Sequence, residues 1–162
     1  MNESYELDQP EHFLVDAVGP KGARVFYLQI VQNGHPVTFK VEKQQVAAMA
    51  DYLESLMGDM PPLEESTHIE LPSLVEPIAS IWAIGQIGVG YDAASDRIIL
   101  HGQELQAQED PTEAATVRVH LQRSQIAAFI DKARQLVAAG RPACPYCNRP
   151  LDPEQGLCAC YN

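Results

Sequence analysis

The stretch VTFKVEKQQVAAMADYLESLM at residues 37–57 decides the fold, because it recurs as VRVHLQRSQIAAFIDKARQLV at residues 117–137. The two stretches align without a gap. In each, apolar residues first alternate with polar ones, which predicts a strand with one buried face. Apolar residues then recur every three or four positions, which predicts an amphipathic helix. Each stretch therefore predicts a strand followed by a helix, with Phe39 and Val119 facing the core.

The similarity continues upstream of both stretches, although with gaps. Residues 13–19 resemble residues 82–88, and residues 24–28 resemble residues 97–100. Turn-forming residues separate these segments, so each unit reads as three strands and a helix. We therefore predict an α+β fold in which two pseudo-symmetric β-β-β-α repeats form one domain, followed by a small C-terminal zinc-binding tail.

The predicted domain boundaries follow from this repeat. We expect a flexible N-terminus, a duplicated α+β domain whose halves are joined by a connector, and a zinc-ribbon-like tail. The ranges are 1–10 for the N-terminus, 11–140 for the domain (repeat one 11–58, connector 59–80, repeat two 81–140) and 141–162 for the tail.

Three glycines, Gly85, Gly88 and Gly90, lie in the first predicted strand of repeat two. They lack the Lys-Ser/Thr of a phosphate-binding loop, and no helix is predicted directly after them. Glycine within a strand indicates close packing or a bulge. We therefore interpret the cluster as structural.

Composition and charge limit the function classes. The 162 residues carry a formal charge of −11, which repels polyphosphate and makes nucleic-acid binding unlikely. The N-terminus lacks the basic start and apolar stretch of a signal peptide. The most apolar segment, residues 74–91, contains Glu76, Pro77 and several glycines and does not predict a membrane span. We expect a cytoplasmic protein.

All four cysteines lie near the C-terminus, as Cys144, Cys147, Cys158 and Cys160. In a reducing compartment, clustered cysteines indicate metal ligands before disulfides. The spacing C-x2-C-x10-C-x-C predicts a structural zinc ion held by four thiolates. Iron in a rubredoxin-like site is the less favoured alternative, and disulfides or free thiols are the others. The last pair is tighter than C-x2-C, so either both of its cysteines bind or one binds with another group.

Several stretches resemble a bacterial domain-of-unknown-function family numbered 3090, found mainly in actinobacteria and Chloroflexi. They are EHFLVDAVGPKGARVFYLQI (11–30), VEKQQVAAMADYLESLM (41–57), WAIGQIGVGYDAASDRIIL (82–100) and AAGRPACPYCNRPLDP (138–153). The resemblance implies an uncharacterised protein with a zinc-ribbon-like tail, which in the family often reads CPxCGxPLDPxGHxCPR. Cys144, Cys147 and Cys158 match that pattern. We interpret Cys160, which is additional, as the replacement for the family's histidine.

No catalytic signature is recognisable in the sequence, and an enzymatic role is not our first expectation. We favour a noncatalytic binding or adaptor module with protein partners. The alternative is an enzyme or small-molecule binder using a cleft between the repeats, lined by Arg24, Arg97 or Lys43. Nucleic-acid binding through the zinc tail ranks last.

Overall fold

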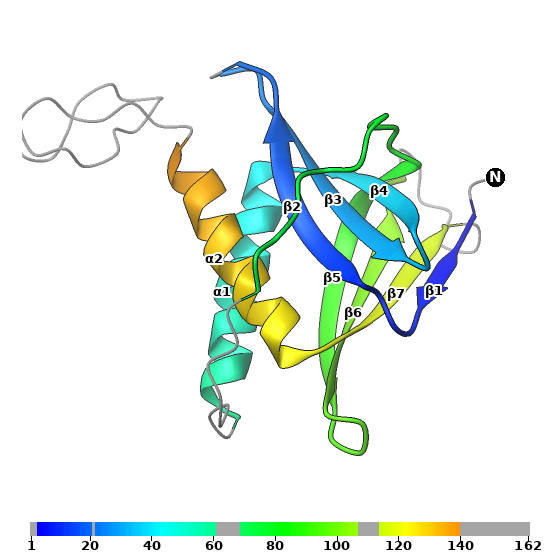
Figure 1. Ribbon diagram of the computed structural model, residues 1–162, viewed down its shortest axis with the longest axis vertical. Helices are drawn as coiled ribbons and strands as arrows, with labels where there is room; N and C mark the ends of the chain where they lie inside the picture. Colours follow the sequence, from blue (N-terminus) through cyan, green and yellow to red (C-terminus); the bar gives the residue numbers. More distant parts are fainter. Residues whose placement is uncertain (1–2, 21, 61–68, 107–113, 140–162) are drawn as a thin grey trace, which may run out of the picture.

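The computed structural model describes residues 3–20, 22–60, 69–106 and 114–139. Within these ranges, seven strands form one mixed sheet in the order β1-β7-β6-β5-β4-β3-β2, and two helices pack against it (Figure 1). Neighbouring strands are antiparallel except for the β1–β7 and β4–β5 pairs, which are parallel. The elements are β1 (Tyr5–Leu7), β2 (His12–Val18), β3 (Val25–Gln32), β4 (His35–Val41), α1 (Lys43–Gly58), β5 (Trp82–Asp92), β6 (Arg97–Glu104), β7 (Thr116–Leu121) and α2 (Arg123–Ala139).

The fold class predicted from the sequence is wrong. The described part of the domain is mostly sheet, with its seven strands in one mixed sheet, rather than two β-β-β-α repeats. The strand and helix expected within residues 37–57 and within 117–137 are present, as β4 with α1 and β7 with α2. Hydrophobic periodicity reports which element forms locally, whereas strand order depends on long-range pairing that it does not encode. The predicted tail lies outside the described residues.

Strand β1 lies within residues 1–10, where the sequence predicted no strand. It pairs in parallel with β7. The carbonyl oxygen of Glu3 accepts a hydrogen bond from the indole nitrogen of Trp82 at 3.0 Å. The Tyr5 and Phe39 rings lie 6.3 Å apart, although β7, β6 and β5 separate their strands in the sheet. The sheet is therefore strongly curled.

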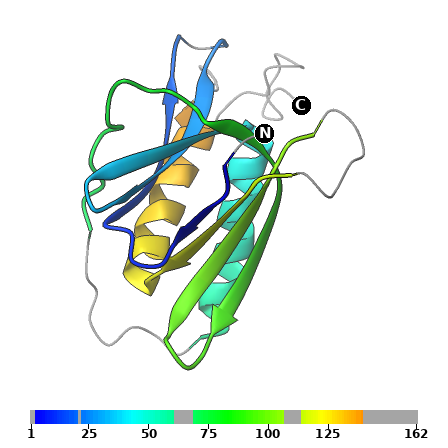
Figure 2. The same cartoon turned by 90° about the vertical axis from the view of Figure 1, so that its right-hand side faces the viewer.

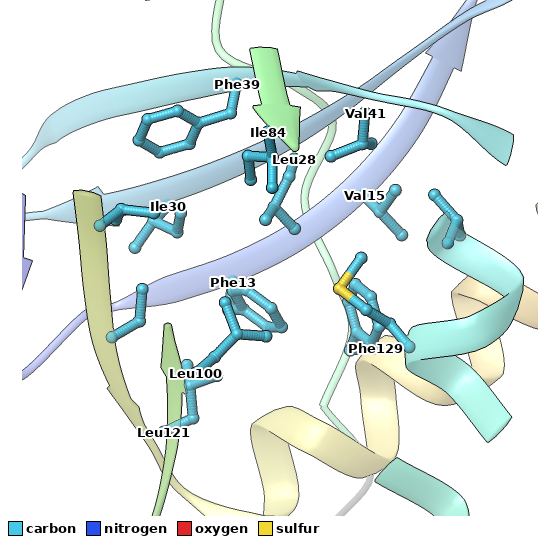
Figure 3. Close-up of a cluster of buried hydrophobic side chains, with 14 of the residues drawn as sticks. Phe13, Val15, Leu28, Ile30, Phe39, Val41, Ile84, Leu100, Leu121 and Phe129 are labelled. Carbon is cyan, nitrogen blue, oxygen red and sulfur yellow. The ribbon is translucent and has the colours of Figure 1, made fainter. Parts of the chain in front are cut away.

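The core fills the inner face of this curled sheet (Figure 3). Phe39 and Val119 are fully buried, which confirms the alternation read from the sequence. The rings of Phe13 in β2 and Phe129 in α2 are 4.8 Å apart. Helix α2 follows β7, near one edge of the sheet, and therefore packs on β2 at the opposite edge. Helix α1 adds a further row of buried side chains: Val46, Met49, Ala50 and Leu53.

Residues 69–79 of the connector contain no helix or strand. The connector crosses β2 and reaches the outer face of β3 and β4 (Figure 1). There the amide of the buried Gln29 accepts a hydrogen bond from the Val75 nitrogen at 2.8 Å. It donates to the Val75 carbonyl at 3.2 Å and to the Thr38 hydroxyl at 3.0 Å. This satisfied buried amide fixes the connector to the sheet.

Candidate functional site

An apolar groove of about 500 Å³ lies between α1 and β5. Figure 2 shows the β5–β6 hairpin alongside α1. The α1 wall consists of Gln45, Ala48, Met49 and Tyr52, and the β5 wall of Gly85, Ile87, Gly88 and Val89. None of these side chains is charged at neutral pH. Met49 is buried beneath the groove, whereas Tyr52 is 57% exposed at its rim.

The groove arises because β5 separates from β4 almost at once. Their parallel pairing comprises two positions, Phe39↔Trp82 and Lys40↔Ala83. The β5–β6 register then shifts between Ile84 and Gln86, as a bulge would make it. After this point β5 continues with β6, and the groove separates its other edge from α1.

Gln45 fastens α1 to β5 at this divergence. Its side-chain nitrogen donates to the carbonyl oxygens of Ile84 at 2.9 Å and Gly85 at 3.1 Å. Its side-chain oxygen accepts a hydrogen bond from the Glu42 nitrogen at 2.7 Å, at the helix start. One side chain therefore caps the first turn of α1 and satisfies two carbonyls that β4 no longer reaches.

Gly85 confirms the structural interpretation of the glycine cluster, and Gly88 lines the groove. A Cβ atom added to Gly85 would lie 2.9 Å from the Cα atom of Leu105, so the bulge requires glycine at that position. At Gly88 no atom lies within 4 Å of the place a Cβ would take. The groove is therefore open beside Gly88.

The corresponding flank of α2 is built from equivalent positions but is covered. The connector residues Ile69, Glu70 and Leu71 lie along Ala128 and Lys132 of α2. Ile69 and Leu71 also lie beside residues 10–13, which include the first two residues of β2. The space left on this flank is divided into hollows of about 450 and 240 Å³, each of which the connector helps to line.

Gln125 repeats the role of Gln45 at the start of α2. Its side-chain oxygen accepts from the Gln122 nitrogen at 2.9 Å, and its side-chain nitrogen donates to the Pro10 carbonyl at 2.9 Å. Each helix is thus capped and anchored to a neighbouring strand segment by the same residue of the repeated sequence. The glutamine is identical in the two repeated stretches, so the sequence indicated a shared role. It did not indicate which segment the side chain would contact.

The residues that the sequence suggested for a cleft, Arg24, Arg97 and Lys43, do not line the groove. The four cysteines are outside the described residues. Within the described ranges, no group of three or more His, Cys, Asp or Glu side chains is placed to hold a metal ion. Arg24 and Lys43 do not line any of the three hollows, and Arg97 makes local hydrogen bonds of 3.3 Å to the carbonyls of Ser95 and Asp96.

The far end of β5 is held to the start of α2. The Tyr91 hydroxyl donates to the Asp96 carboxylate at 2.6 Å, and the Arg123 guanidinium donates to the same oxygen at 3.1 Å. The hydrogen bond from Tyr91, followed by that from Arg123 and its charge, lowers the pKa of Asp96 below its ordinary value. Together with the hydrogen bonds from Gln45 to the other end of β5, these contacts connect both ends of the strand to the start of a helix.

These features define a class: a curled mixed-sheet domain with two helices and an uncharged groove beside an incompletely paired strand. No helix in the described part of the chain is long and apolar enough to cross a membrane. The chain belongs to the family described as protein of unknown function (DUF3090), whose model matches residues 5–158. The family expected from the sequence is therefore confirmed. The match includes Cys144, Cys147 and Cys158 and ends before Cys160. Neither a curated protein nor a solved structure matches the chain.

Proposed function

We propose that the domain is a noncatalytic binding or adaptor module whose protein partner docks in the groove between α1 and β5. The observation that carries this proposal is the open apolar groove itself, whose equivalent on α2 is covered by the connector. Among the described residues, the connector lies beside the α2 flank and no segment lies over the α1 groove, which supports the availability of this groove to another molecule.

The chemistry of the groove favours a protein over a small substrate. A reaction site needs a placed acid, base, nucleophile or charge, and the groove walls supply one phenol and one amide among apolar groups. The amide of Gln45 is already bonded to β5 and to the helix start. A protein segment, in contrast, can fill an elongated apolar groove with aliphatic side chains.

For the C-terminal segment we propose a structural zinc ion held by Cys144, Cys147, Cys158 and Cys160, with iron as the alternative. The support is the cysteine spacing alone. We further propose that the protein is cytoplasmic, where thiolates stay reduced. Metal analysis of anaerobically purified protein should find about one zinc per chain. Protein that carries neither zinc nor iron would remove this part of the proposal.

The groove proposal is tested by site-specific photo-crosslinking in the native cell. A photoreactive amino acid replaces Tyr52 at the groove rim, and in a matched protein it replaces Lys132, the equivalent position on the covered flank of α2. We expect position 52 to trap a defined protein and position 132 to trap none. The Ala48→Arg substitution should abolish the cross-link, because it fills the groove with a charged side chain. Equal trapping at both positions, or no trapping at 52, would contradict the proposal.

A further inference from the structure

We propose that the partner binds as an added β-strand: an extended basic segment with aliphatic residues at alternate positions hydrogen-bonds to the free edge of β5. This inference rests on the proposed function and specifies the chemistry of its partner. It follows from the edge of β5, from the way the other sheet edges are protected, and from what covers the equivalent flank.

The direction of the backbone groups in β6 can be read from two hydrogen bonds. The Glu104 nitrogen donates to the Ala115 carbonyl at 2.8 Å, so Glu104 directs its backbone groups toward β7. Because these groups alternate along a strand, Gln103, the next residue, directs its own toward β5. Thr116 lies opposite Gln103, and its nitrogen donates to the Ser4 hydroxyl, away from β6, as this alternation requires.

The same alternation fixes the two edges of β5. Gly88 and Gly90 lie opposite residues of β6 that point toward β5, so their backbone groups bond to β6. Ile87, Val89 and Tyr91 then direct their N–H and C=O groups to the other edge, which faces the groove. In the described chain, the pairing of β4 with β5 ends at Ala83 and does not reach them. They form a row of three donors and three acceptors ready for another strand.

This edge lacks two of the features that prevent strand addition, a charged side chain and a proline. Its sequence from Gln86 to Tyr91 is QIGVGY, which contains no charged residue and no proline. The two outer edges of the sheet differ from it. Strand β2 carries Asp16, whose carboxylate lies 3.9 Å from the Lys132 ammonium of α2. Connector residues lie beside the start of this strand. Strand β1 is only three residues long.

The covered flank indicates which side chains the open groove accepts. There, Ile69 and Leu71 are half-buried against α2 while Glu70 between them is exposed. The open groove presents the equivalent helix position Ala48, with Ile87 and Val89 opposite. A strand added to β5 would place every second side chain on this face, so aliphatic residues should alternate. The chain's charge of −11 favours Lys or Arg between them.

The test uses synthetic, fluorescein-labelled ten-residue peptides in which Ile or Leu alternates with Lys or Thr, and fluorescence anisotropy with the full-length protein. Two further sets carry backbone N-methyl groups on one or the other alternate set of residues. N-methylation removes donors along one peptide edge only. We expect one methylated set to bind as well as the parent and the other to lose about tenfold or more in affinity, the cost of lost edge hydrogen bonds. Replacing Lys with Glu should weaken binding, most strongly at low salt.

The matched protein variants are Ala48→Arg, which fills the groove, and Gln44→Arg, which adds the same side chain at an exposed position of α1 outside it. The first should abolish peptide binding and the second should preserve it. If both methylated sets bind like the parent, or no peptide binds while position 52 still cross-links a partner, strand addition is wrong and the proposed function stands. If neither peptide binding nor cross-linking is found, both are wrong.

Discussion

The two helices present equivalent flanks to the sheet, and the flanks differ in what covers them. Gln45 and Gln125 cap the helices in the same way, and Ala48 and Ala128 take the same positions in the two hollows. On α2 the chain's own connector lies along the flank, whereas on α1 the flank is an open groove beside a strand edge. The repeated local sequence forms the same flank on each helix. The connector, which is not repeated, lies beside the flank of α2.

The largest expected effect is a difference in stability loss when the buried residue beneath each flank is truncated. Phe129 is fully buried against Phe13, and its counterpart Met49 is buried beneath the open groove. Phe129→Ala should lower the free energy of unfolding by about 3–5 kcal/mol, and Met49→Ala by about 2 kcal/mol, because the open side can relax. Urea denaturation measures both. A larger cost for Met49→Ala would mean that the α1 flank is the tighter one.

A smaller effect should come from the connector. Ile69 and Leu71 are half-buried, so replacing both with serine should cost about 1.5–3 kcal/mol, roughly half of the value for fully burying two such side chains. Tyr52→Ser on the open flank should change stability by no more than about 0.5 kcal/mol. Thermal unfolding of both variants compares the flanks directly. Equal losses would show that the connector does not cover α2 as described.

The capping glutamines should matter on both flanks. Gln45→Ala removes three hydrogen bonds and Gln125→Ala removes two, so each should cost about 1 kcal/mol, with the larger loss at Gln45. Chemical denaturation of the two variants beside the wild type measures the difference. If Gln45→Ala is silent, its hydrogen bonds to β5 do not hold α1 in place.

The smallest effect concerns pH at the far end of β5. The pKa of Asp96 is lowered by the hydrogen bond from Tyr91 and by Arg123. A lowered folded-state pKa contributes stability above the ordinary value of 3.8, and this contribution is lost as pH falls from that value through the folded-state pKa. Asp96→Asn should therefore lower the melting temperature slightly near pH 7 and bring the two proteins together in acid. A difference that persists unchanged below pH 3 or so would show that charge is not the cause.

The sequence predicted local structure well because local structure depends on periodicity. The alternation around Phe39 and Val119 identified buried positions, and the glycine cluster indicated the bulge found at Gly85. Strand β1 was missed because three residues are too few to show alternation. The strand order was missed because it depends on contacts distant in sequence, such as the hydrogen bond from Trp82 to Glu3.

The candidate site was harder to predict than the fold elements. The groove exists because β5 leaves β4 after Ala83, and the connector residues that the structure describes lie beside α2. Neither event leaves a pattern in the residues that line the groove, since aliphatic residues at these positions are typical of any core. The metal site predicted at the four cysteines stays a prediction, because those residues lie outside the described part of the chain.

The free edge of β5 is tested most directly by amide hydrogen exchange, followed residue by residue with NMR in the protein without a partner. We predict alternating rates along the strand: slow exchange at Gly88 and Gly90, whose amides bond to β6, and fast exchange at Ile87, Val89 and Tyr91. Slow exchange at all five amides would show that the edge is already paired. That result would contradict both the open groove and the strand addition proposed for it.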